Sequence, residues 1–200
     1  MRRLVGSAVA ILAAGAALTG CSAPPAESGE DLKARAEFLV LEEQWAEAIS
    51  VLKEYLIRHP EDSGAHFYLG RCWLNVAEFN GREGPWLVLA EGELRLARQL
   101  FYAQGKRSTI KRFPDSYFDI ICNIERAKVY LRQLTFVIDH PGQLAGATLE
   151  SILASLQQAV DDAKAIDPAA PDVVNLENLL KSLTDDGPAP QPRAGAGTAI

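Results

Sequence analysis

The sequence predicts an all-α fold for the central part of the chain. Apolar residues recur at three- and four-residue spacings, beginning with Trp45, Ala48, Ile49, Leu52 and Leu56, and this spacing places them along one side of a helix. Prolines and glycines interrupt the pattern at intervals. No run alternates apolar and polar residues in the way that a half-buried strand does.

The helices can be placed in order from their breaks. Pro60 ends the first clear stripe, and Asp62 or Ser63 is suited to cap the next helix, which carries Leu69 and Trp73. A break is expected at 81–85, a polar turn at 105–114 and another break at 140–142. The later helices are then predicted over residues 86–104, 115–138, 147–166 and 172–183.

The N-terminus has the pattern of an export signal. Met1-Arg2-Arg3 precedes an uncharged, apolar stretch over residues 4–20, which is short for a membrane span. The stretch ends in Leu18-Thr19-Gly20-Cys21, which resembles the lipobox of bacterial lipoproteins. The resemblance implies cleavage before Cys21 and a covalent diacylglycerol and N-acyl lipid on its thiol and amine. An uncleaved anchor, or an ordinary signal with a stray cysteine, are the alternatives.

The same segment also predicts where in the cell the protein is located. By analogy with bacterial lipoproteins, Ser22 in place of Asp favours the periplasmic face of the outer membrane. Residues 22–29 read as a tether of at most roughly 28 Å, which would hold the folded part close to the membrane. The Gly-, Ala- and Pro-rich residues 185–200 are expected to be a disordered tail.

Composition bounds the remaining possibilities. About 180 residues follow the signal, enough for one domain. Loss of Arg2 and Arg3 takes the net charge from −6 to −8, which disfavours general binding of nucleic acid. Cys72 and Cys122 lie in apolar helical contexts; they are expected to be buried thiols, with a disulfide as the alternative.

A 34-residue repeat connects the first helices. Leu32, Ala36 and Leu39 recur as His66, Gly70 and Trp73, with small residues where two helices would cross. Together with Ala48-x3-Leu52 and Pro60, this resembles the tetratricopeptide repeat. The resemblance implies a right-handed α-solenoid of about three helix pairs, with the helix at 172–183 as a C-terminal cap. A plain helical bundle with an accidental match is the alternative.

The same resemblance implies a groove for a protein or peptide partner, lined by the first helix of each pair. In that frame Phe67 and Arg71 would hold an apolar anchor beside a carboxylate. The full set of groove positions is Lys33, Glu37, Leu41, Phe67, Arg71, Leu74 and Asn75.

A second candidate site is a basic loop. The loop contains four cations, Lys106, Arg107, Lys111 and Arg112. They would contact an acidic partner or lipid headgroups, and the alternative is that they are only solvated. The three histidines show no metal-ligand spacing, and no catalytic motif is present. We therefore expect no catalytic residues, no metal and no cofactor besides the lipid.

Three functions remain open at this point. The first is a membrane-anchored, periplasm-facing scaffold or adaptor of the cell envelope. The second is a fixed structural subunit of an envelope assembly, secretion or transport complex. The third is a solute-binding lipoprotein, which would need a pocket under residues 80–114 with converging polar groups.

Overall fold

The structure is a computed structural model, and it describes residues 27–77, 83–144 and 146–185. Within these ranges the chain is all-helical and contains no strand. The helices are α1 (Gly29–Leu41), α2 (Trp45–Arg58), α3 (Ser63–Ala77), α4 (Glu83–Ala103), α5 (Asp115–Asp139), α6 (Leu149–Ile166) and α7 (Pro171–Asp185). None of the described helices is long and apolar enough to cross a membrane.

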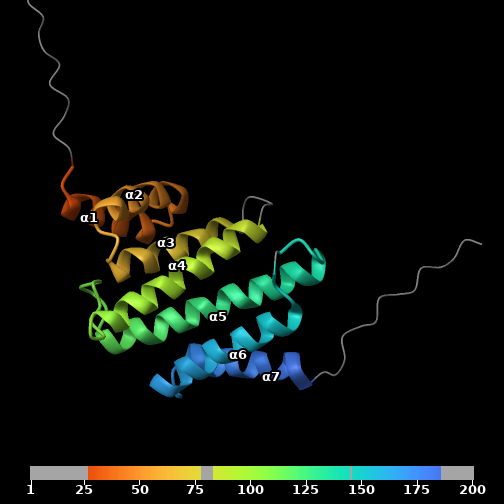
Figure 1. The fold of residues 1–200 in the computed structure, drawn as a ribbon. Helices are drawn as coiled ribbons and strands as arrows, with labels where there is room; N and C mark the ends of the chain where they lie inside the picture. The colour runs from red at the N-terminus through yellow and green to blue at the C-terminus, as the bar shows by residue number, and fades with distance from the viewer. Residues whose placement is uncertain (1–26, 78–82, 145, 186–200) are drawn as a thin grey trace, which may run out of the picture.

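The helices pack in chain order. Each contacts the next one, and Figure 1 shows the succession from α1 and α2 at one end to α6 and α7 at the other. A second set of backbone contacts joins α1 to α3, α3 to α5 and α5 to α7, whereas the backbones of α2, α4 and α6 do not pack against one another. The ion pair between Arg98 and Asp162 joins α4 to α6 through side chains. The odd-numbered helices thus form a continuous layer, and the even-numbered helices lie beside it as separate elements.

Two apolar clusters form the core, and α5 belongs to both. Phe118, Cys122 and Val129 on one side of α5 pack with α1 to α4. Ile124 and Ala127, on another side of the same helix, pack with α6 and α7. Because the two sides of one helix are buried in different clusters, α5 joins the two halves of the described chain.

Small residues lie where helices approach closely, as the repeat pattern predicts. A Cβ atom built on Gly70 would lie 2.6 Å from Leu94 Cγ and 3.2 Å from the backbone oxygen of Ala90. Ala36 and Ala48 are fully buried. The α3–α4 contact therefore depends on the missing side chain at Gly70.

Most predicted breaks are confirmed, with differences at the boundaries. Asp62 caps α3 by accepting a hydrogen bond from the Ala65 N–H at 3.0 Å. The expected break at 81–85 is wrong for its last three residues, because α4 already begins at Glu83 and Pro85 is tolerated in a first turn. The expected tail lies almost wholly outside the described residues.

Candidate functional site

The predicted groove residues of α1 line a cavity at one end of the odd-numbered layer. Lys33 and Glu37 face a space of about 580 Å³ that is also bordered by Tyr55, Thr109 and Lys111. Lys111 belongs to the basic loop. The structure therefore brings together two regions that the sequence presents as separate candidate sites.

The predicted groove residues of α3 line a second cavity. Arg71, Leu74 and Asn75 border a space of about 350 Å³ between α3 and α5, whose other lining residues are Glu125, Lys128, Leu131 and Arg132. The buried Glu125 carboxylate lies 2.9 Å from Lys128 Nζ and 3.9 Å from Arg71 Nε. The lining carries three cations and one carboxylate, so this part of the layer favours anionic groups.

The groove prediction for Phe67 is wrong as an accessible contact, whereas Leu74 borders the second cavity although it is almost buried. Phe67 is 0% exposed and Leu74 is 5% exposed. The loop between α4 and α5 covers this part of α3: Phe113 packs edge-on against Phe67, with ring centroids 6.3 Å apart, and Ile110 is fully buried. Phe67 therefore holds the chain's own loop, and no ligand anchor is available there. Leu41 is exposed at the end of α1 but lines neither cavity.

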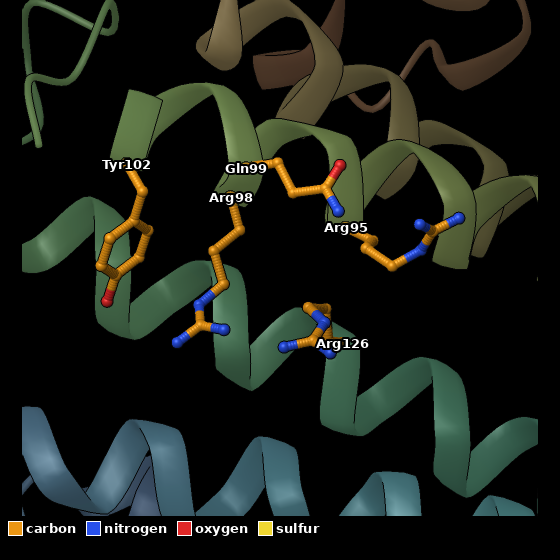
Figure 2. Close-up of a pocket in the computed structure, with 5 residues that line it drawn as sticks. All are labelled: Arg95, Arg98, Gln99, Tyr102 and Arg126. Carbon is orange, nitrogen blue, oxygen red and sulfur yellow. The ribbon is translucent and has the colours of Figure 1, made fainter. Parts of the chain in front are cut away.

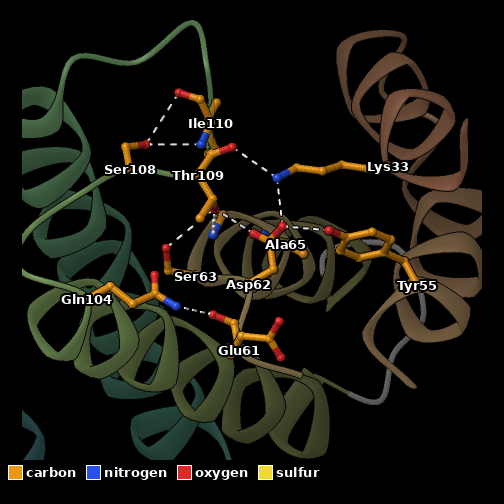
Figure 3. A network of polar contacts seen from close by, with 11 residues as sticks. Lys33, Tyr55, Glu61, Asp62, Ser63, Ala65, Gln104, Ser108, Thr109 and Ile110 are labelled. Atoms are coloured by element: carbon orange, nitrogen blue, oxygen red, sulfur yellow. Dashed lines mark hydrogen bonds and ion pairs between the residues drawn. The ribbon is translucent and has the colours of Figure 1, made fainter. Parts of the chain in front are cut away.

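Asp62 ties this loop to the first three helices (Figure 3). Its carboxylate accepts hydrogen bonds from Lys33 Nζ at 2.6 Å, Tyr55 Oη at 2.8 Å and Thr109 Oγ1 at 2.5 Å. Burial alone would raise the pKa of Asp62, but the hydrogen bonds from Lys33 and Thr109 outweigh it and the pKa is lowered. Lys33 also donates to the Thr109 carbonyl at 2.9 Å, so the ionised carboxylate fixes the loop.

The Tyr68 hydroxyl fixes the other end of the loop. It accepts hydrogen bonds from Arg112 Nε at 3.1 Å and Nη2 at 2.7 Å, and the guanidinium also lies over the Phe113 ring. Burial raises the pKa of Tyr68 to about 12, with a further upward effect of Glu37 that Arg112 opposes. Arg112 of the loop and Glu37 of α1 thus shift the pKa of the Tyr68 hydroxyl in opposite directions.

The basic loop holds unneutralised charge. Among the described residues, every lysine and arginine outside this loop forms a salt bridge except Lys53. None of the four loop cations does so with a described carboxylate. Lys106 instead lies 4.8 Å from the Tyr102 ring centroid. The sequence identified the cluster; in the structure Arg112 is bound to Tyr68, whereas Arg107 and Lys111 are exposed.

A further cavity lies on the side of the even-numbered helices, partly within residues 80–114, and the sequence analysis named none of its residues (Figure 2). Its lining residues are Arg95, Arg98, Gln99 and Tyr102 of α4 and Arg126 of α5. The four α4 residues are three and four positions apart, so their common side of the helix could have been predicted from the sequence. Their meeting with Arg126, which lies in another helix, could not.

The remaining reactive side chains, His66, Cys72 and Cys122, are buried. His66 is 7% exposed, and its ring nitrogens lie 2.6 Å from Glu93 Oε2 and 2.9 Å from the Pro60 carbonyl. Cys72 and Cys122 are buried free thiols whose pKa values burial raises. The described residues contain no cluster of potential metal ligands. Cys21 and the lipobox residues Leu18, Thr19 and Gly20 lie outside the described residues.

Comparison with known proteins gives no relative. No protein-family model, no curated protein and no solved structure matches the chain.

Proposed function

We propose that the chain is an exported lipoprotein, acylated on Cys21, that acts as an adaptor for a protein or peptide of the cell envelope. In this proposal residues 30–184 form a tetratricopeptide-like right-handed solenoid, and α7 caps its last pair. The lipid would hold the domain at the periplasmic face of the outer membrane and raise its local concentration there.

The contacts among odd-numbered helices carry this proposal. A solenoid of helix pairs stacks the first helix of each pair against the first helix of the next, and this stack forms its binding surface. Here the backbones of α1, α3 and α5 contact one another in succession, while those of α2, α4 and α6 do not, and α4 meets α6 only through side chains such as Arg98 and Asp162. Predicted groove residues line cavities along that same layer.

The polarity of the layer favours recruitment of a partner over a fixed structural role. Both cavities are lined largely by charged side chains, including Lys33 and Glu37 in one and Arg71 and Lys128 in the other. A permanent subunit contact is expected to show a contiguous apolar patch instead. The partner segment that fits has carboxylates near Lys128 and groups of both charges near Lys111, because Glu30, Asp31 and Glu37 border the first cavity together with the lysines.

Charge reversal tests the binding surface. The double substitution Lys111→Glu with Lys128→Glu changes two exposed side chains of the proposed surface, whereas Lys53→Glu makes the same change on the exposed side of α2. In a chemical-crosslinking pull-down of the membrane-anchored protein, the double variant should lose its partner and Lys53→Glu should retain it. Equal recovery from both variants would contradict the proposal.

The lipid anchor is tested separately. Cys21→Ser should abolish incorporation of a radiolabelled fatty acid and release the chain from the membrane fraction. Unchanged labelling and fractionation of this variant would rule out acylation at Cys21.

A further inference from the structure

The loop between α4 and α5 lies at the same end of the molecule as the start of α1. Gly29 and Asp31 of α1 border the same cavity as Thr109 and Lys111 of the loop. Lys33 Nζ also donates a hydrogen bond to the Thr109 carbonyl at 2.9 Å. Figure 1 shows the start of α1 and this loop at one end of the stack, and the connection from α5 to α6 at the other.

The lipid anchor holds that end near the membrane, a step that rests on the proposed acylation of Cys21. Residues 22–29 lead from Cys21 into α1 and span at most roughly 28 Å. α5 has 25 residues and is therefore about 37 Å long. The far end of α5 cannot face the membrane end-on without raising the start of α1 beyond the reach of the tether. The α4–α5 loop, in contrast, lies within that reach.

The tip of this loop carries two cations without a carboxylate partner. Lys106 and Arg107 are exposed, and neither forms a salt bridge with a described carboxylate. The acidic groups at this end face other partners: the Asp115 carboxylate accepts a backbone N–H of the loop at 2.7 Å. Glu30 and Asp31 border the first cavity. The positive charge of the tip is therefore free to meet an external anion.

Backbone hydrogen bonds fix the tip at the end of α4. The Lys106 N–H donates to the Phe101 carbonyl at 2.8 Å, and the Gly105 N–H donates to the Tyr102 carbonyl at 3.1 Å. Gly105 has a φ of 72°, and the pair of bonds is the one that commonly closes a helix at a glycine. The two cations thus project from a defined place on the molecule.

Exposed tyrosines flank the tip. Tyr102 in the last turn of α4 is 41% exposed, and Tyr117 in the first turn of α5 is 46% exposed. The Lys106 Nζ lies 4.8 Å from the Tyr102 ring centroid, and the Tyr117 ring packs against Phe113. Tyrosine is enriched at membrane–water interfaces, where its ring lies at the level of the headgroups. Cations beside exposed tyrosines, at the tethered end, fit an anionic lipid surface better than they fit an acidic protein segment.

We propose that this loop tip, Lys106 and Arg107 with Tyr102 and Tyr117 beside them, rests on anionic phospholipid headgroups and orients the anchored domain. The phosphate groups of the lipid pair with the two cations. Each cation near an anionic leaflet favours the contact roughly fivefold. In this orientation the cavity beside Lys128, further along α5, stays away from the lipid and accessible to a partner.

Lysine labelling in vesicles tests the contact. The full-length acylated protein is reconstituted in vesicles of phosphatidylcholine alone, or of phosphatidylcholine mixed with phosphatidylglycerol, and treated with an amine-acetylating reagent. Mass spectrometry measures the labelling rates of Lys106 and of Lys53, which is exposed on α2. We expect Lys106 to react about fivefold more slowly in the anionic vesicles, with recovery at high salt, and Lys53 to react equally in both.

Matched variants separate the tip from the general charge of the protein. Arg107→Glu reverses one of the two tip charges and should return Lys106 to its labelling rate in neutral vesicles. Arg95→Glu makes the same change further back on α4, at a side chain that is 56% exposed, and should leave Lys106 protected. Both positions are on the surface, so neither substitution disturbs the core.

Three results would overturn the assignment. Two of them are equal labelling of Lys106 in both kinds of vesicle, and protection that Arg107→Glu does not remove. The third is loss of the envelope partner by Arg107→Glu in the pull-down, which would assign the tip to an acidic protein. The intact mass of the protein shows acylation before reconstitution. A missing lipid would therefore refute the anchor itself, whereas missing protection of the acylated protein would refute only the contact.

Discussion

Replacement of Gly70 by alanine tests the packing on which the helix stack depends. In an open helical position this change stabilises a protein by up to about 1 kcal/mol, because alanine is the better helix former. At Gly70 the new methyl group would lie 2.6 Å from Leu94 Cγ and 3.2 Å from the Ala90 carbonyl oxygen. Neither is the free end of a flexible side chain, so α3 and α4 must separate.

The expected magnitude follows from these two opposing effects. Overpacking of this kind costs about 1–3 kcal/mol. After subtraction of the helix-propensity gain, Gly70→Ala should destabilise the fold by up to about 2 kcal/mol, which corresponds to a Tm lower by up to about 8 °C. Thermal and denaturant unfolding followed by circular dichroism measure both quantities.

Gly92 provides the matched control on the partner helix. A Cβ atom there meets nothing within 4 Å, so Gly92→Ala should raise the free energy of unfolding by up to about 1 kcal/mol. The two variants make the same chemical change with opposite expected signs. Stabilisation by Gly70→Ala, equal to that by Gly92→Ala, would refute the close α3–α4 contact.

Three further predictions concern side chains that the structure buries. Phe67→Ala should cost about 3–5 kcal/mol in chemical denaturation, because a 0% exposed ring is removed; a cost under about 1 kcal/mol would mean that Phe67 is an accessible groove residue after all. Asp62→Asn should cost about 2–3 kcal/mol and speed amide hydrogen exchange in residues 104–114, since it removes the charge that Lys33 and Thr109 bind; unchanged exchange would contradict this role. Burial lowers the pKa of His66, but the hydrogen bond to Glu93 more than offsets it and the net shift is upward. The stabilisation from the His66–Glu93 pair is therefore complete at pH values below the ordinary histidine pKa of 6.5, and it is lost as the pH rises through the higher pKa of the folded state. His66→Gln should remove this pH dependence of the unfolding free energy. An unaltered pH dependence in the variant would count against the pair.

The sequence was sufficient to predict the helices because their signals are local. Apolar spacing located the helices, and Pro60, Gly105 and Gly142 marked the breaks, the two glycines having positive φ. The start of α4 was placed too late because glycine and proline at 84 and 85 read as a break. In the structure they occupy a first helical turn, where proline costs little.

The site was less predictable because it depends on tertiary contacts. The repeat resemblance supplied the groove positions on α1 and α3, and Lys33, Glu37, Arg71 and Asn75 border two cavities in the structure. The burial of Phe67 follows from Phe113, which is 46 residues later in a loop that the repeat pattern does not contain. Convergence of Arg126 with the α4 arginines likewise needs the packing of α5.

Site-specific photo-crosslinking is the most direct test of the adaptor surface. A photoreactive residue is placed at Glu37 or Asn75, on the odd-numbered layer, and at Lys53 on α2 as the control. We predict that Glu37 and Asn75 capture the same envelope protein and that Lys53 does not. Capture of that protein from Lys53, with none from Glu37 or Asn75, would contradict the account.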